Sequence, residues 1–209
     1  DKRYQTEYGR PIADHGMTLA PGDAVFVDLN GDGVLNGDDA TRDIGFTDIP
    51  EYTAGLNLGF SWKNFDFSMQ WTGAWNVDRM LSEFRRPLGD TNSKALLLYQ
   101  YETTWRSSED TFTAKFPRAS NSHASNNYRG TDLYLINASY LRLKNVEIGY
   151  NFDFPFMKKM KLDNCRLYIN GYNLLTITGF DWGDPESRQS DRPNYPLTRV
   201  FNIGLKVGF

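Results

Sequence analysis

The segment from Asp28 to Asp39 has the ligand spacing of an EF-hand-type calcium loop. Oxygen-bearing side chains alternate along it, and Gly33 at the sixth place permits the sharp bend that such a loop needs. Position 12 is an aspartate rather than the usual bidentate glutamate, and no flanking helices are evident. We predict a Ca²⁺ site here, and the alternative is a surface turn rich in Asp, Asn and Gly. The residues at the ligand positions are Asp28, Asn30, Asp32, Val34, Asn36 and Asp39.

Residues that could catalyse a reaction form no recognisable motif. The two histidines, His15 and His123, lie in turn-rich segments, and no G-x-S-x-G, H-E-x-x-H, Walker or G-x-G-x-x-G pattern occurs. Asp181 with Asp184 or Glu186 could form a glycosidase pair. However, neighbours within one loop do not set the carboxylate separation which that reaction requires. We therefore expect that the protein is not an enzyme.

The composition excludes some classes of partner. The chain has 209 residues and a formal net charge of −3, whereas a nucleic-acid-binding protein should show a basic face. The Lys158, Lys159 and Lys161 cluster is most simply a solvated turn. Cys165, the single cysteine, cannot form an internal disulfide, and we expect a buried thiol rather than a nucleophile.

Two consecutive segments alternate between apolar and polar residues, which predicts a β-hairpin. Residues 53–62 carry apolar side chains at the even positions, and Lys63 and Asn64 form the tight turn. Residues 65–75 then alternate again. The apolar side chains of the second strand are Phe65, Phe67, Met69, Trp71 and Trp75.

Three later segments are also predicted strands. In residues 139–150 the apolar phase slips from odd to even positions near Lys144, which indicates a β-bulge or an exit from the buried zone. Residues 165–175 form the next strand, and residues 198–209 alternate up to the final Phe209.

The remaining residues are predicted loops. Residues 1–52 are rich in Gly, Asp and Pro, with a short strand at residues 24–27. Residues 76–137 form a long polar stretch, in which Leu97, Tyr101 and Trp105 predict a helix over residues 94–105. Segments of this length without regular structure are usually functional or mobile.

These strands have the properties of an outer-membrane barrel. No stretch of 18 or more apolar residues occurs, but a membrane-spanning β-strand needs only about 9–11 residues with one apolar face. Aromatic residues gather at the strand ends, and short and long connections alternate, as in bacterial barrels. Because the smallest such barrels have about eight strands, we expect this chain to be part of a longer one. The alternative hypothesis is a secreted all-β, calcium-stabilised glycan-binding module.

The motifs, taken in order, resemble the C-terminal part of SusC/RagA-type TonB-dependent outer-membrane transporters. The string from Tyr140 to Tyr150 is followed by residues 173–176, residues 184–186, Tyr195-Pro196 with Arg199, and a terminal Phe. The loop at residues 28–33 and the hairpin at residues 55–71 also lie where that family has them. The match covers nearly the whole chain, with residues 1–52 as an extracellular loop region and residues 53–209 as barrel strands.

The resemblance implies an all-β fold of antiparallel strands that form part of a 22-stranded transmembrane barrel with long extracellular loops. It implies nutrient uptake across the bacterial outer membrane, with glycan or peptide cargo, a SusD-like lipoprotein over the mouth, and coupling to TonB through an N-terminal part that this chain lacks. Phe209 would be the barrel-insertion signal, and the strands would contact lipid. Aromatic residues of the long loops would contact a ligand or, more often, the lipoprotein: Trp105, Phe112, Tyr128, Tyr134, Phe180 and Trp182.

Overall fold

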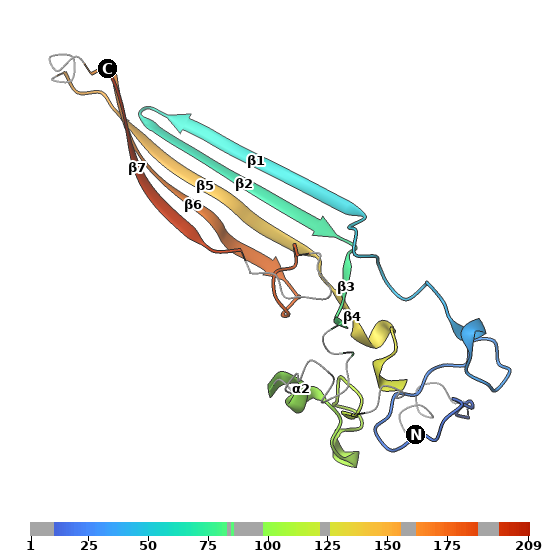
Figure 1. The fold of residues 1–209 in the computed structure, drawn as a ribbon. Coiled ribbons are helices and arrows are strands. Elements are labelled where there is room, and N and C mark those ends of the chain that lie inside the picture. The colour runs from blue at the N-terminus through green and yellow to red at the C-terminus, as the bar shows by residue number, and fades with distance from the viewer. Residues whose placement is uncertain (1–10, 83–84, 86–97, 122–125, 156–161, 188–196) are drawn as a thin grey trace. The chain divides into compact units, whose positions relative to one another are not determined.

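A five-stranded antiparallel sheet dominates the computed structural model, which describes residues 11–82, 85, 98–121, 126–155, 162–187 and 197–209 (Figure 1). The strand order is β1-β2-β5-β6-β7, so each strand is hydrogen-bonded to its neighbours in this series. The bounds are β1 (Tyr52–Trp62), β2 (Phe65–Trp75), β5 (Tyr140–Phe152), β6 (Asn164–Thr178) and β7 (Val200–Gly208). The five predicted strands and the antiparallel all-β class are confirmed.

The smaller elements lie in the segments predicted to be loops. A second, two-stranded sheet joins β3 (Asp78–Met80) to β4 (Leu135–Asn137). One short helix, α2 (Leu98–Thr103), accompanies four 3₁₀ turns in the described part of the chain. No helix among the described residues is both long and apolar enough to cross a membrane. The 3₁₀ turns are η1 (Gly37–Asp39), η3 (Ser108–Asp110), η4 (Asn126–Tyr128) and η5 (Asp132–Tyr134).

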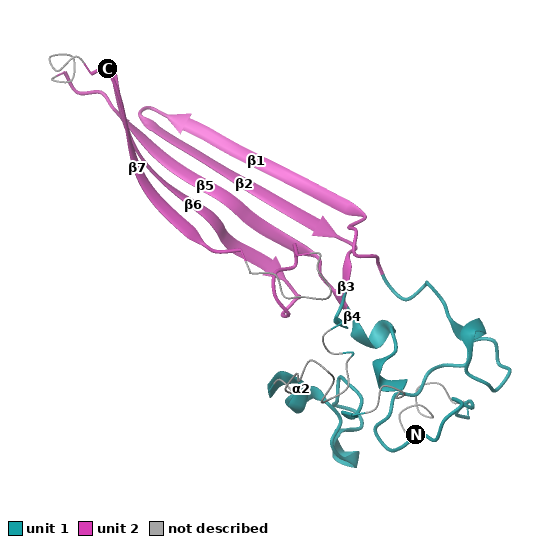
Figure 2. Ribbon diagram, viewed as in Figure 1, with its two compact units in different colours: residues 1–45, 80–135 teal, residues 46–79, 136–209 magenta. Residues whose placement is uncertain are grey.

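The chain divides into two compact units (Figure 2). Unit 1 comprises residues 1–45 and 80–135, and unit 2 comprises residues 46–79 and 136–209. Unit 1 has a small apolar core, which includes Phe116 stacked on Tyr134 with 5.6 Å between the ring centroids. Unit 2 is built on the five-stranded sheet. Much of the long polar stretch is therefore folded with the N-terminal segment rather than forming an open loop.

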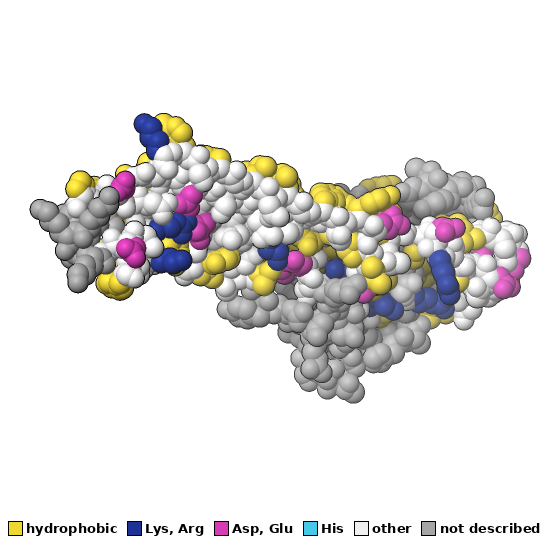
Figure 3. Space-filling model, turned by 90° about the horizontal axis from the view of Figure 1, so that it is seen from above, with side chains coloured by type: hydrophobic (Ala, Val, Ile, Leu, Met, Phe, Trp, Pro, Cys, Tyr) yellow, Lys and Arg dark blue, Asp and Glu magenta, His cyan; other side chains and the backbone are white. Residues whose placement is uncertain are grey.

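One face of the sheet is apolar along every strand. Phe60, Phe67, Ile148, Ile169 and Ile203 are register partners in one row across all five strands. These side chains are not covered by another layer of described residues, and Ile203 is 76 % exposed. Figure 3 shows hydrophobic side chains along one margin of the sheet, with acidic and basic side chains gathered beside them. A soluble sandwich would bury such a face against a second sheet.

A β-bulge keeps this apolar face continuous. Gln70 pairs with Asn145 and Trp71 pairs with Leu143, so Lys144 is the extra residue on β5. The bulge returns the apolar side chains to the same face after the phase slip in the sequence. The predicted irregularity near Lys144 is confirmed as a bulge within the strand.

Two local predictions are wrong. Residues 24–27 form no strand, because the N–H groups of Ala24 and Phe26 donate to side chains, to Asn127 Oδ1 at 2.7 Å and to His15 Nε2 at 3.0 Å, instead of to a strand partner. Cys165 is only partly buried, because its side chain lies on the uncovered apolar face.

Other predictions are partly tested by the described residues. The predicted helix over residues 94–105 is observed only as α2, and residues 94–97 lie outside the described residues. His123 and the cluster of Lys158, Lys159 and Lys161 also lie outside the described residues.

Candidate functional site on the polar face of the sheet

A network of hydrogen-bonded side chains joins four strands across the polar face. Arg166 on β6 donates to Asp66 on β2 and to Glu147 Oε1 on β5, the latter at 2.7 Å. Glu147 Oε2 accepts from Asn170 Nδ2 at 3.3 Å, and Asn170 Oδ1 accepts from Asn202 Nδ2 on β7 at 2.9 Å. Because every charge and amide in this series has a partner, the network fixes the relative positions of β2, β5, β6 and β7.

Glycine makes room for this network. Gly149 on β5 is the register partner of Asp66 on one side and of Tyr168 on the other. A Cβ atom at this position would overlap Arg166 Nη2 and Asp66 Oδ2. The absence of a side chain therefore lets the ion pair lie flat across the strand.

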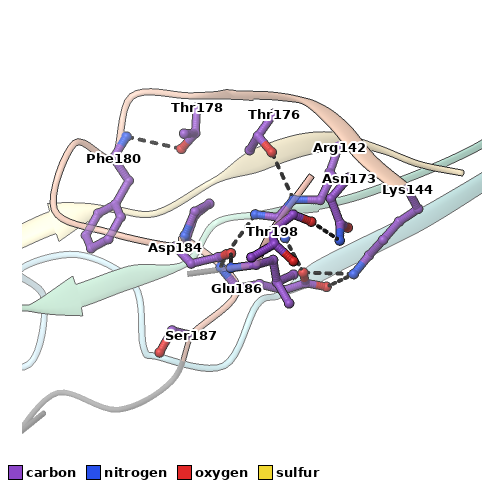
Figure 4. Close-up of polar contacts among 12 residues, drawn as sticks. Arg142, Lys144, Asn173, Thr176, Thr178, Phe180, Asp184, Glu186, Ser187 and Thr198 are labelled. Carbon is purple, nitrogen blue, oxygen red and sulfur yellow. Dashed lines mark hydrogen bonds and ion pairs between the residues drawn. The ribbon is translucent and has the colours of Figure 1, made fainter. Parts of the chain in front are cut away.

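A second polar cluster lies further along β5 and centres on Arg142, whose side chain is 3 % exposed (Figure 4). The Arg142 guanidinium donates to Thr176 Oγ1 at 3.0 Å, to Glu186 Oε2 at 2.8 Å and to Asp184 Oδ1 at 2.7 Å. Lys144, the bulge residue, donates to the same Glu186 Oε2 at 2.9 Å. Two cations and two carboxylates thus balance one another on the polar face.

The Asp184 carboxylate has further donors from its own loop. It accepts from the N–H groups of Glu186 at 2.9 Å and Leu197 at 3.2 Å. Burial acts to raise the pKa of Asp184, but the hydrogen bonds from Arg142 and from the two backbone groups outweigh it and hold the pKa below its ordinary value. Asp184 and Glu186 are therefore members of ion pairs with cations and do not form an isolated carboxylate pair.

Carboxylates of the predicted calcium loop accept hydrogen bonds from the backbone N–H groups of the same loop. Asp28 accepts from the N–H groups of Gly31 and Gly33 at 2.6 and 2.8 Å, and Asp39 accepts from Asn36 N–H at 2.9 Å. The last contact is the main cause of a lowered pKa of Asp39. Among the described residues, no group of three or more His, Cys, Asp or Glu side chains is placed to hold a metal ion. Calcium binding by Asp28, Asn30, Asp32, Val34, Asn36 and Asp39 stays a prediction.

The aromatic residues predicted to contact a ligand or partner differ in exposure. In unit 1, Phe112 is 67 % exposed, whereas Tyr134 is 2 % exposed and its hydroxyl donates to Asn127 O. Burial raises the pKa of Tyr134. Trp105 and Tyr128 are half-buried, as are Phe180 and Trp182 in unit 2. Their contacts with a ligand or a lipoprotein stay predictions, and so does the insertion role of Phe209, which is 89 % exposed.

Sequence reasoning missed the arginines that organise this face. Arg142 and Arg166 occupy polar-face positions of strands that were otherwise assigned correctly, and Arg79 lies in β3. The alternation of apolar and polar residues places both strand arginines on the polar side of the sheet, and carboxylates follow β6 in the sequence. The sequence does not show which arginine pairs with which carboxylate, because that depends on the strand register and on the path of the chain after β6.

No family model matches the chain. A TonB-dependent receptor of Formosa agariphila is 31 % identical over 206 residues, which cover 90 % of this chain and 19 % of the relative. The TonB-dependent receptor SusC of Bacteroides thetaiotaomicron is 25 % identical over 205 residues, covering 97 % of this chain and 18 % of that protein. The structure of the RagAB peptide importer in the closed-closed state matches with a TM-score of 0.64 and 23 % identity, over 88 % of this chain and 20 % of that chain.

The fold and these relatives define an antiparallel segment of an outer-membrane receptor. The chain belongs to the SusC/RagA-type TonB-dependent receptors, as its motifs predicted, and spans about a fifth of the length of the curated relatives it matches. The relatives are receptors and transporters, which confirms the expectation that the chain is not an enzyme. Outer-membrane localisation is confirmed in the same way.

Proposed function

We propose that this chain forms part of the barrel wall of an outer-membrane nutrient importer. The observation that carries the proposal is the difference between the two faces of the sheet. No second layer of described residues covers the apolar face along the five strands, and each strand has exposed apolar side chains on it, as a surface in contact with hydrocarbon requires. The opposite face carries paired charges and amides, which suit a water-filled or protein-filled interior.

The partners and cargo follow from the same proposal. A SusD-like lipoprotein would cover the extracellular mouth, and unit 1 would supply part of the surface on which it rests. TonB would act through parts of the receptor outside this chain. The cargo would be a glycan or a peptide, and a peptide is the cargo of the structural neighbour, the RagAB peptide importer.

Growth of a deletion strain tests the proposal. The gene for the whole receptor is deleted and restored, and each strain is grown with defined polysaccharides or with a casein peptide digest as the sole nutrient. We expect slower growth on one of these nutrients, restored by the intact gene but not in a strain that lacks TonB. Equal growth of all strains on every nutrient, with the receptor present in the outer-membrane fraction, would contradict the proposal.

A further inference from the structure

The residues that follow β6 fold back onto the polar face of the sheet and are held there from two sides. Arg142 and Lys144 hold the side chains of Asp184 and Glu186 (Figure 4). Arg79 holds the backbone of the same segment, since its Nε donates to the carbonyl of residue 187 at 2.9 Å and its Nη2 to that of residue 185 at 3.4 Å.

The burial of these groups makes the loss of any one of them costly. The side chain of Asp184 is 7 % exposed, that of Arg142 is 3 % exposed, and residue Arg79 is 6 % exposed. Removing one member of a buried ion pair leaves an uncompensated charge, which costs far more than the loss of a surface pair. The Glu186 side chain is 31 % exposed and is shared between Arg142 and Lys144, so it contributes less.

We propose that residues 184–187 are a fixed part of the passage wall rather than a moving lid, and that Arg142 is the positioning residue that fixes them. The passage rests on the proposed function, whereas the attachment to the polar face rests on the contacts above. In an Arg142→Gln variant, the Asp184 and Glu186 carboxylates lose their shared cation. The side-chain attachment of the segment to β5 is then weakened, while the contacts made by Lys144 and Arg79 remain.

Amide hydrogen exchange of the whole purified receptor in detergent tests the attachment. The peptide covering residues 179–187 should exchange slowly in the wild type and at least about tenfold faster in Arg142→Gln, with β1 and β2 unchanged. Arg142→Lys should restore part of the protection, because the charge returns without the forked geometry. Glu186→Gln should increase the exchange rate of this peptide by less than Arg142→Gln does. Asp181→Asn, at an exposed position of the same loop, should leave the exchange rate unchanged.

The outcomes separate this inference from the proposed function. Equal exchange in the wild type and Arg142→Gln, or an equal increase in Asp181→Asn, overturns the attachment. Faster exchange in Arg142→Gln, with growth on the nutrient identified above still at the wild-type rate, overturns the role in the passage. Faster exchange together with slower growth supports both. Failure of the wild-type receptor to support growth on any nutrient rejects the proposed function, and with it the passage, while the exchange result still decides the attachment.

Discussion

The Arg142 guanidinium donates to Asp184 Oδ1 at 2.7 Å, and this ion pair joins residues that are 42 positions apart in the sequence. Both side chains are almost completely buried on a face of the sheet that is otherwise polar and accessible. The pair therefore attaches residues 184–187, which follow β6, to β5.

This pair should make the loop sensitive to acid. The pKa of Asp184 is lowered in the folded protein, so the carboxylate stabilises the fold above its unfolded pKa of about 3.8. That contribution is lost as the pH falls through the still lower folded pKa. We expect protection of residues 179–187 against proteolysis to be constant from pH 7 to pH 5 and to fall at more acidic pH in the whole receptor. In Asp184→Asn the protection should already be weak at pH 7, and an acid transition of wild-type size in that variant would contradict the assignment.

Gly149→Ala should destabilise the sheet by separating Arg166 from Asp66. The new methyl group would occupy the space between the two partners, and overpacking of this kind costs about 1–3 kcal/mol. Thermal unfolding of the purified receptor measures the effect. Gly55→Ala is the matched control, because Gly55 also lies on the polar side of a strand and its nearest neighbour would be 3.8 Å away. Equal melting temperatures for both variants would show that Gly149 has no such role.

Gly22→Ala should loosen unit 1. Gly22 has a positive φ of 85°, and a Cβ atom there would overlap the ring of Trp105. Gly16 has a φ of 68°, and a methyl group there would have no neighbouring atom within 4 Å, so Gly16→Ala carries the backbone strain alone. We expect faster proteolysis within residues 98–121 for Gly22→Ala than for Gly16→Ala. The same cleavage rate in both variants would exclude the packing contact as the cause.

Calcium binding at residues 28–39 is directly measurable. We expect calorimetric titration of CaCl₂ into the metal-free receptor to give a saturable heat that is lost in the double variant Asp28→Ala and Asp32→Ala. Asp38→Asn is the control, since Asp38 lies outside the ligand positions of the loop. Identical heats for the wild type and the double variant would remove the calcium site.

The sequence predicted the strands well because each is long and one of its faces is apolar. The bulge at Lys144 was visible as a change of phase, since a continuous apolar face demands an extra residue there. Residues 24–27 misled the interpretation, because their β-branched and aromatic side chains favour a strand while their N–H groups bond to side chains from distant segments.

The site was harder to predict than the strands. Asp184 and Glu186 were noticed as carboxylates, but their partners depend on how the loop folds back and on the register of β5 with β6. In the sequence, nothing distinguishes Arg142 from the other polar-face residues of its strand. Such long-range ion pairs leave no periodic pattern, because only the tertiary fold sets the distance between the two groups.

The orientation of the two faces is the central claim, and neighbouring residues of β7 test it most directly. In the whole receptor, Cys165 is replaced by serine, and Ile203 or Asn202 is replaced by cysteine and labelled with a nitroxide. The labelled receptor is then reconstituted into lipid vesicles. We predict that the label at Ile203 collides readily with oxygen and little with a water-soluble nickel chelate, and that the label at Asn202 does not share this preference for oxygen. Equal exposure of both labels to the nickel chelate would contradict the assignment of the apolar face to the membrane.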